Sequence, residues 1–136
     1  MSKLAKPLAI TGLGVFSFFI AVVIWIESAS GDKAVISDVR ADFSSIGSAL
    51  RNYKINTGHY PSTEQGLKAL VERPTTPPLP DNWVQTANKV PKDPWRNEYR
   101  YRGFPEGSPH HFELISNGAD GIEGTKDDRS LSDRKH

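Results

Sequence analysis

The sequence contains no cysteine among its 136 residues. This absence excludes a disulfide framework, a zinc site with thiolate ligands and a cysteine nucleophile. A chain of this length is enough for one domain with a short appendage, but not for two separate cores. The fold must therefore depend on a hydrophobic core, to which a hard metal ion could add stability.

An excess of basic charge is also lacking. The chain has 17 Lys and Arg residues against 16 Asp and Glu residues, and Lys3 and Lys6 precede an apolar run that ends at Ile26. All the acidic residues follow that run, so the remainder of the chain is close to neutral. Because proteins that bind nucleic acid through bulk charge need a basic surplus to neutralise phosphates, we expect no nucleic-acid partner.

Motifs that carry catalysis are missing as well. The chain has no G-x-S-x-G nucleophile motif and no glycine-rich phosphate loop after a strand. His110 and His111 are adjacent, so in a strand their side chains point to opposite faces and cannot share one metal ion. An extracytoplasmic hydrolase would need a pocket that joins one of them to Asp93 or Glu98. We therefore expect no enzyme, no catalytic residues and no small-molecule substrate.

One long apolar segment dominates the N-terminal part. Leu8–Ile26 holds nineteen residues without a charge, and at about 1.5 Å per residue a helix of this length covers ~28 Å, close to the ~30 Å hydrocarbon core of a bilayer. Trp25 suits the membrane interface, and Lys3 and Lys6 favour a cytoplasmic N-terminus. The pattern predicts a single-pass membrane anchor over residues 1–30.

A cleaved signal peptide is the alternative for this segment. Ser28-Ala29-Ser30 offers a small-residue cleavage site, although a signal peptide's apolar region is usually only about 7–15 residues long. Both interpretations place residues 31–136, as one domain, outside the cytoplasm.

A helical stripe follows the apolar segment. Apolar residues recur at steps of three and four, the period of an amphipathic helix that lays one face on a domain. Gly58 marks the expected end of this helix. The stripe consists of Val35, Val39, Phe43, Ile46, Leu50 and Tyr53.

The middle of the chain is short of regular structure. Ser62 and Gln65 have the spacing of a capping box, followed by a short amphipathic helix over residues 67–71. Six of the ten prolines lie between Pro74 and Pro94, which predicts a rigid irregular loop. We expect Trp83 and Trp95 to be buried and to hold this loop in place.

Two strands are predicted further on. Residues 99–102 alternate strictly between aromatic and basic side chains, residues 111–115 form a second candidate, and the segment between them is rich in Gly and Pro. The predicted fold class is therefore α+β, with a long N-terminal helix, first transmembrane and then amphipathic, packed on a small antiparallel sheet.

The loop from Asn117 to Asp128 is the most informative segment. It holds three glycines and three aspartates, and clustered carboxylates repel one another unless a cation lies between them. Calcium takes six to eight oxygen ligands in flexible geometry, which a glycine-rich loop can supply. The spacing is not that of an EF-hand. From spacing alone, a calcium site and a solvated acidic turn remain equally open.

Three motifs follow one another beyond the apolar segment. They are Tyr60-Pro61-Ser62-Thr63-Glu64-Gln65-Gly66-Leu67, then Pro91-Lys92-Asp93-Pro94-Trp95-Arg96-Asn97-Glu98-Tyr99, then Ser116-Asn117-Gly118-Ala119-Asp120-Gly121 with Gly124-Thr125 and Asp127-Asp128 after it. In this order the motifs resemble one known family, the major pseudopilin (G subunit) of bacterial type II secretion. The resemblance covers residues 35–129, most of the chain beyond the apolar segment.

This resemblance implies a pilin-like fold with a C-terminal calcium-binding loop. The family's ligand positions fall on Asp120, Asp127 and Asp128, which would donate side-chain oxygens, and on Asn117 and Ile122, which would donate backbone carbonyls. The implied role of Ca²⁺ is structural, since it would neutralise the carboxylates and order the C-terminal segment.

The N-terminal segment departs from the family pattern. Pseudopilins carry a short basic leader, a glycine before the cleavage point, then Phe-Thr-Leu and a glutamate at the fifth mature position. Met1–Ile26 contains neither the Gly-Phe-Thr-Leu run nor an acidic residue. Entry of this helix into a fibre by the family's route is therefore a separate question from the fold.

Two functional hypotheses follow. The first is a structural subunit of a type II secretion fibre, anchored in the bacterial inner membrane by one span, with its C-terminal domain in the periplasm. Its partners would be further copies of itself and other secretion-system subunits. The alternative is a membrane-anchored extracytoplasmic binding module of pilin-like fold that does not polymerise.

Overall fold

The structure, a computed structural model, describes the backbone of residues 13–134 and the side chains of residues 35–132. The chain divides into two units, Met1–Ala34 and Val35–His136, and all the described side chains belong to the second. Among the described residues, no helix has the length and apolar character to cross a membrane. The anchor predicted over residues 1–30 lies outside the described side chains, so the anchor and its boundary with residues 31–136 stay predictions.

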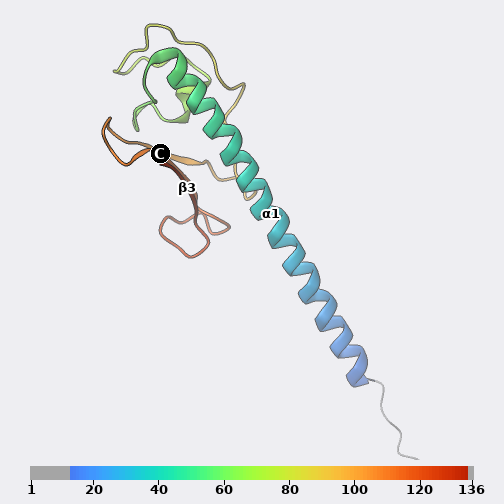
Figure 1. The fold of residues 1–136 in the computed structure, drawn as a ribbon. Helices are drawn as coiled ribbons and strands as arrows, with labels where there is room; N and C mark the ends of the chain where they lie inside the picture. The colour runs from blue at the N-terminus through green and yellow to red at the C-terminus, as the bar shows by residue number, and fades with distance from the viewer. Residues whose placement is uncertain (1–12, 135–136) are drawn as a thin grey trace, which may run out of the picture. The chain divides into compact units, whose positions relative to one another are not determined.

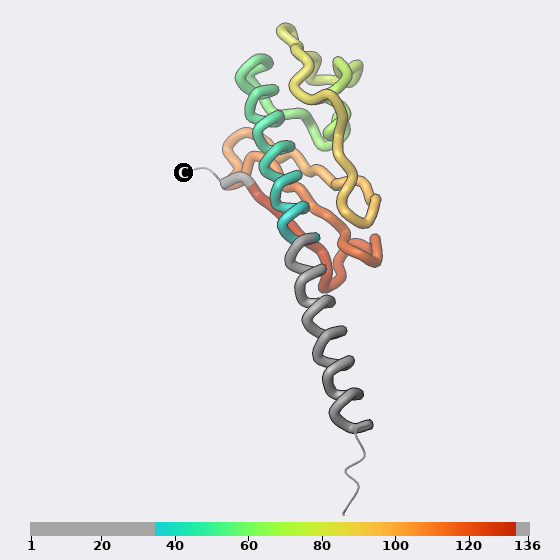
Figure 2. Tube along the Cα trace, turned by 90° about the vertical axis from the view of Figure 1, so that its right-hand side faces the viewer, coloured from blue at the N-terminus to red at the C-terminus, as the bar shows by residue number. Residues whose placement is uncertain are grey.

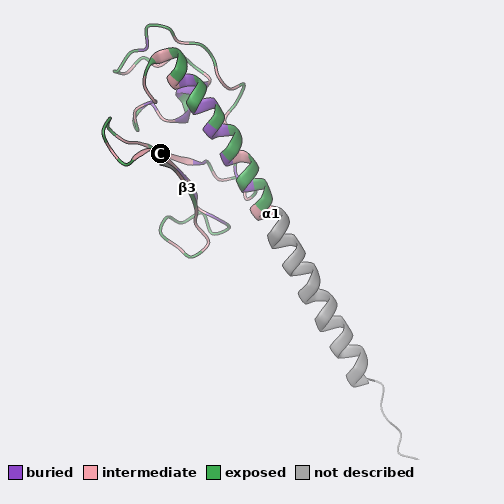
Figure 3. Ribbon diagram, in the orientation of Figure 1, coloured by how far each residue is buried: buried purple, intermediate pink, exposed green. Residues whose placement is uncertain are grey.

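A single long helix, α1 (Leu13–Thr57), precedes the other elements. The helical stripe is confirmed from Val39 onward, because Val39, Phe43, Ile46, Leu50 and Tyr53 are all buried. Val35, the first residue of the predicted stripe, is only half-buried. Figure 3 shows the buried positions along one side of the C-terminal part of α1 and exposed positions along the other. The apolar period of the sequence thus selects the face that meets the core.

Gly58 ends α1, as the sequence predicts. Its φ of 84° lies in the left-handed region, and its backbone N–H donates to the carbonyl of Lys54 at 2.8 Å. This is the glycine C-cap, in which a residue without Cβ takes the conformation that closes the last helical turn.

Three antiparallel strands form one sheet in the order β1–β2–β3, and Figure 1 labels the last of them, β3. The strands are β1 (Arg100–Gly103), β2 (His110–Ser116) and β3 (Arg129–Arg134). The first two confirm the predicted strands to within a residue or two. Strand β3 was not predicted from the sequence, because its residues are polar apart from Leu131. Pairing with β2, not apolar alternation, makes this segment a strand.

The core lies between α1 and the sheet. Phe112 and Leu114 of β2 are fully buried, and the ring of Phe43 on α1 lies 5.4 Å from that of Tyr99. The hydroxyl of Tyr99 donates to Asp42 at 2.6 Å. One helix packed on a small antiparallel sheet confirms the α+β class predicted from the sequence.

The segment between α1 and β1 lies alongside the C-terminal part of α1 (Figure 2). It contains a 3₁₀-helix, η1 (Leu67–Leu70), and is otherwise irregular, as its prolines predict. Ser62 and Gln65 do form reciprocal hydrogen bonds, at 3.0 and 3.1 Å. The prediction that Ser62 caps a helix was nevertheless wrong, because these bonds close a turn and η1 begins only after Gly66.

The two tryptophans of this segment are half-buried, not buried as expected. Both pack against the core, and the indole N–H of Trp83 donates to the carbonyl of Ala69 at 2.8 Å. A large amphipathic ring can thus hold the irregular segment while part of its surface stays in solvent.

Candidate functional site

The predicted metal loop joins the last two strands of the sheet. Ser116 at the end of β2 is paired with Arg129 at the start of β3, so the two ends of the loop lie side by side (Figure 1). Ser116 is fully buried and Leu114 before it belongs to the core. The loop is therefore anchored on the most buried strand of the molecule.

A second segment, the turn around Asp93, supports this anchor. Asp93 is only 3% exposed. Its Oδ1 accepts hydrogen bonds from the backbone N–H groups of Trp95, at 3.1 Å, and Asn97, at 2.7 Å. Its Oδ2 accepts the hydroxyl of Ser116 at 2.7 Å. This carboxylate thus ties the turn before β1 to the end of β2.

Asn97 links the turn around Asp93 to the loop. Its side-chain amide donates to the carbonyl of Gly118 at 2.8 Å, and the N–H of Gly118 donates to Ser116 Oγ at 3.2 Å. Gly118 has a φ of 65°, and a Cβ atom at this position would lie 2.4 Å from Asp127 Oδ2. Only glycine fits here, because both the left-handed backbone and the close carboxylate exclude a side chain.

Asp127 is held by two donors inside the loop. Its Oδ1 accepts the hydroxyl of Thr125 at 2.6 Å, and its Oδ2 accepts the backbone N–H of Asp120 at 3.1 Å. The Thr125 hydrogen bond, followed by that of the Asp120 N–H, lowers the pKa of Asp127 to about 2. The carboxylate is therefore ionised at neutral pH, as a calcium ligand must be.

The other two carboxylates also accept backbone N–H groups. Asp120 Oδ1 accepts from Ile122 at 2.8 Å, and Asp128 Oδ2 accepts from Gly124 at 2.8 Å. The second oxygen of Asp128, Oδ1, is buried and has no hydrogen-bond partner. A buried carboxylate oxygen without a partner is costly, so this atom is an acceptor that a cation could satisfy.

The two predicted carbonyl ligands lie at the start of the loop, at Asn117, and near its middle, at Ile122. The carbonyl of Ile122 accepts the Thr125 hydroxyl at 3.2 Å. The side chain of Asn117 donates to the carbonyl of Gly121 and accepts from Arg100, both at 3.4 Å. These contacts fix the backbone of the loop on both sides of Asp120.

The structure brings only part of the predicted ligand set together. Asp127 contacts the backbone of Asp120, whereas Asp128 binds the opposite side of the loop at Gly124. Among the described residues, no three His, Asp or Glu side chains are grouped closely enough to hold a metal ion. The donor types and the unpartnered oxygen of Asp128 still fit a hard cation, since carboxylates and carbonyls are the ligands calcium takes.

Four residues that hold the loop in place were not predicted from the sequence to take part in the site. Asp93, Asn97, Ser116 and Thr125 hold it through side chains, but none was assigned a role from the sequence. The Asp-Pro pair at residues 93–94 is a recognisable turn signal. Its link to Ser116, 23 positions further on, depends on tertiary packing and has no sequence signal.

The two histidines lie against different aromatic rings, as expected of neighbours in a strand. His110 is 6.1 Å from Phe104, and His111 is 5.2 Å from Tyr60, measured between ring centroids. Asp93 is engaged in the turn described above. The structure thus gives no support to the pocket that the hydrolase alternative needs.

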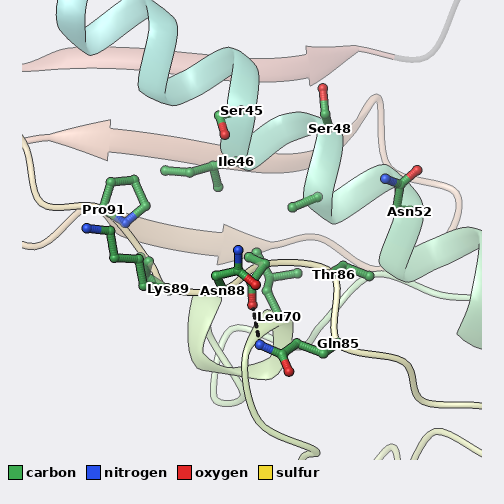
Figure 4. Close-up of a pocket in the computed structure, with 13 residues that line it drawn as sticks. Ser45, Ile46, Ser48, Asn52, Leu70, Gln85, Thr86, Asn88, Lys89 and Pro91 are labelled. Carbon is green, nitrogen blue, oxygen red and sulfur yellow. Dashed lines mark hydrogen bonds between the residues drawn. The ribbon is translucent and has the colours of Figure 1, made fainter.

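A cleft of about 630 Å³ lies elsewhere, between α1 and residues 85–91 (Figure 4). Its polar rim consists of hydroxyl and amide side chains with one charged group, Lys89, over an apolar floor that includes Ile46 and Leu70. Of the described side chains, no carboxylate or imidazole lines it. Histidine and carboxylate side chains are the residues that most often act in general acid–base catalysis, and Lys89 is the one titratable group in this lining.

The fold is that of a pseudopilin. The crystal structure of the major pseudopilin from the type 2 secretion system of enterohaemorrhagic Escherichia coli superposes with a TM-score of 0.69 at 31% sequence identity. The match covers 94% of this chain and 96% of that one. The chain belongs to the family described as type II secretion system (T2SS), protein G, which it matches over residues 28–133.

Curated relatives agree with this assignment. The type II secretion system core protein G of Pseudomonas aeruginosa is 44% identical over 98 residues, which cover 71% of this chain and 68% of that protein. The corresponding protein of Escherichia coli K12 is 40% identical over 104 residues, with 75% and 67% covered. That of Pectobacterium carotovorum is 41% identical, and the match covers 62% of its length. The chain thus matches about two thirds of the length of these relatives.

Proposed function

We propose that this protein is a structural subunit of a type II secretion fibre and not an enzyme. The observation that carries the proposal is the family match over residues 28–133, together with the pseudopilin neighbour that covers 94% of the chain. In this role the chain would be anchored in the bacterial inner membrane by the segment Leu8–Ile26, with residues 31–136 in the periplasm. It would assemble with copies of itself and with other secretion-system subunits.

Cross-linking in membranes tests the assembly. The full chain would be expressed in cells with and without a type II secretion apparatus, and membranes would be treated with an amine-reactive cross-linker. A ladder of multimers that depends on the apparatus is the expected result. Monomer alone, or monomer joined to one other protein, would favour the alternative of a binding module that does not polymerise.

The proposal includes a calcium ion in the loop. Asp120, Asp127 and Asp128 would hold it through carboxylate oxygens, and Asn117 and Ile122 through backbone carbonyls. The unpartnered Oδ1 of Asp128 supports this assignment. Bound Ca²⁺ would supply positive charge among three carboxylates. The chain's own contribution is to position these oxygens, through Thr125 on one side and the buried Asp93 turn on the other.

Calorimetric titration of the full chain in detergent tests the ion. Stoichiometric binding of Ca²⁺, with a melting temperature that rises in calcium and falls in a chelator, is expected because a ligand that binds only the native state stabilises it. Absence of binding would remove calcium from the proposal while leaving the fibre subunit in place.

A further inference from the structure

A groove with an apolar floor and a basic rim lies between α1 and β3. It measures about 610 Å³. Val39 and Phe43 on α1 and Leu131 on β3 form apolar parts of its lining, and Leu131 is 39% exposed although its strand position faces the helix. A half-exposed leucine on the core side of an edge strand shows that the described residues leave this side of the core incompletely covered.

Three arginines line the groove: Arg40 and Arg51 from α1, and Arg129 from β3. Among the described residues the ion pairs join Lys68 to Glu72 and Arg100 to Glu123, so no carboxylate neutralises any of the three. Among the residues whose side chains the structure describes, no acidic one lines the groove. Its occupant should therefore combine negative charge with an apolar side chain.

The tip of the acidic loop has this chemistry. Ile122 is 61% exposed, and its backbone is held on both sides, by the N–H bond to Asp120 and by the Thr125 hydroxyl on its carbonyl. The loop carries Asp120, Glu123, Asp127 and Asp128 against one Lys126. With a divalent cation bound, the residues of the loop keep one net negative charge, and the exposed Glu123 is also paired with Arg100 of the same chain. The tip thus presents an exposed apolar side chain next to an acidic one.

We propose that the tip of the loop of one copy, residues 121–124 with Ile122 at its centre, docks into the α1–β3 groove of a second copy. The two surfaces share no residue, so one molecule can offer both at once. A contact between two different surfaces is heterologous, and repeated from copy to copy it generates an open, helical assembly rather than a closed dimer. The inference rests on the proposed fibre and names one contact within it.

Disulfide cross-linking between two differently tagged full-length chains tests the contact. The chain has no native cysteine, so Ile122→Cys in one chain and Leu131→Cys in the other can form a mixed dimer only between molecules. We expect the mixed dimer on oxidation of membranes that hold both variants and the secretion apparatus. Leu79→Cys is the matched control for Ile122→Cys, because Leu79 is 60% exposed but lies outside the loop. This control should give no mixed dimer with Leu131→Cys.

Charge reversal provides a second readout. Arg40→Glu in the Leu131→Cys chain should lower the yield of mixed dimer by about two- to five-fold, the effect of an exposed charge pair, and more strongly at low salt. Lys89→Glu, an exposed cation outside the groove, should leave the yield unchanged.

The outcomes separate this contact from the fibre itself. An amine cross-linked ladder without the mixed dimer would overturn the docking contact and leave the fibre standing. Equal yields of mixed dimer with Leu131→Cys from Ile122→Cys and Leu79→Cys would overturn it as well, because the disulfide would then form by random collision and not at a specific contact. Loss of both the ladder and the mixed dimer would count against the fibre and the contact together.

Discussion

The hydroxyl of Ser116 donates a 2.7 Å hydrogen bond to Asp93 Oδ2, and both residues are buried. This contact joins the end of β2 to the turn before β1. The same Ser116 oxygen accepts the N–H of Gly118, where the acidic loop begins. The candidate metal loop is thus built on a buried polar cluster as well as on the apolar core.

Asp93→Ala should destabilise the domain. The substitution leaves the backbone N–H groups of Trp95 and Asn97 and the hydroxyl of Ser116 without their acceptor, and unpaired buried donors cost about 1–3 kcal/mol each. We expect a loss of at least about 2 kcal/mol in the free energy of unfolding, measured by denaturant titration. Asp81→Ala, at an exposed carboxylate, is the control and should change it by less than about 0.5 kcal/mol. Equal effects of the two variants would contradict the role given to Asp93.

Asp127→Ala should abolish the calcium-dependent rise in melting temperature. The substitution removes the acceptor of Thr125 and of the Asp120 N–H together with one proposed calcium ligand. Scanning calorimetry with calcium and with a chelator measures the difference. Asp81→Ala should retain the full calcium effect. A variant at residue 127 that still gained thermal stability from calcium would show that the ligand set is wrong.

Gly118→Ala and Gly124→Ala should differ sharply. Both glycines have positive φ, 65° and 87°, so each alanine costs about 1–2 kcal/mol for the left-handed backbone. At Gly124 a Cβ meets nothing within 4 Å, whereas at Gly118 it lies 2.4 Å from Asp127 Oδ2. Gly118→Ala should therefore be the more destabilising and should also weaken calcium binding, as thermal melts and calcium titration would show. Indistinguishable melts would mean that the loop can relax around the added methyl group.

Alkaline pH should unfold the domain through its tyrosines. Burial raises the pKa of Tyr53, and burial followed by the Asp42 hydrogen bond raises that of Tyr99. A raised pKa means that the native state holds its proton more tightly than the unfolded state. The stability this contributes is complete below the ordinary value of 10.0 and is lost as the pH rises above it.

An alkaline pH titration tests this coupling. Ultraviolet absorbance reports the ionisation of the tyrosines, and circular dichroism reports the unfolding of the domain. Ionisation of the buried tyrosines should coincide with unfolding. Tyr99→Phe removes one titrating group and also the Asp42 hydrogen bond, so it should lower stability at neutral pH and flatten the loss above pH 10.0. Ionisation of Tyr53 and Tyr99 in a domain that stays folded would contradict the prediction that these buried tyrosines must remain protonated for the domain to fold.

Regular local patterns account for what could be predicted. Val39 to Tyr53 recur at the helical period and Gly58 follows them, so the helix, its buried face and its end could be read directly. The strict alternation of aromatic and basic residues at 99–102 predicted β1 in the same way. The acidic and glycine residues at 117–128 predicted a loop that either binds a cation or is a solvated acidic turn, and the resemblance to the family favoured the cation site.

Non-local contacts account for what was missed. The strand β3 has a single apolar side chain, Leu131, and exists because β2 offers it a pairing edge. Ser62 and Gln65 form the two predicted hydrogen bonds, but these bonds close a turn and do not begin a helix. Contacts with neighbouring segments, and not the capping box alone, decide whether a helix follows. Trp83 and Trp95 were assigned to the interior by residue type, yet their ring positions depend on segments that approach from elsewhere.

The sequence by itself determined the helix, the α+β class and the family, because each of these rests on periodicity or motif order along the chain. It also predicted a calcium site in the loop, which stays a prediction. Only the tertiary structure decided that Asp93 and Asn97 support the loop. Only the tertiary structure shows that the hydroxyl of Thr125 donates to Asp127, and that a groove lined by arginines lies between α1 and β3. These relationships join residues far apart in the chain, and their energies come from burial and hydrogen-bond geometry, which exist only once the segments have packed.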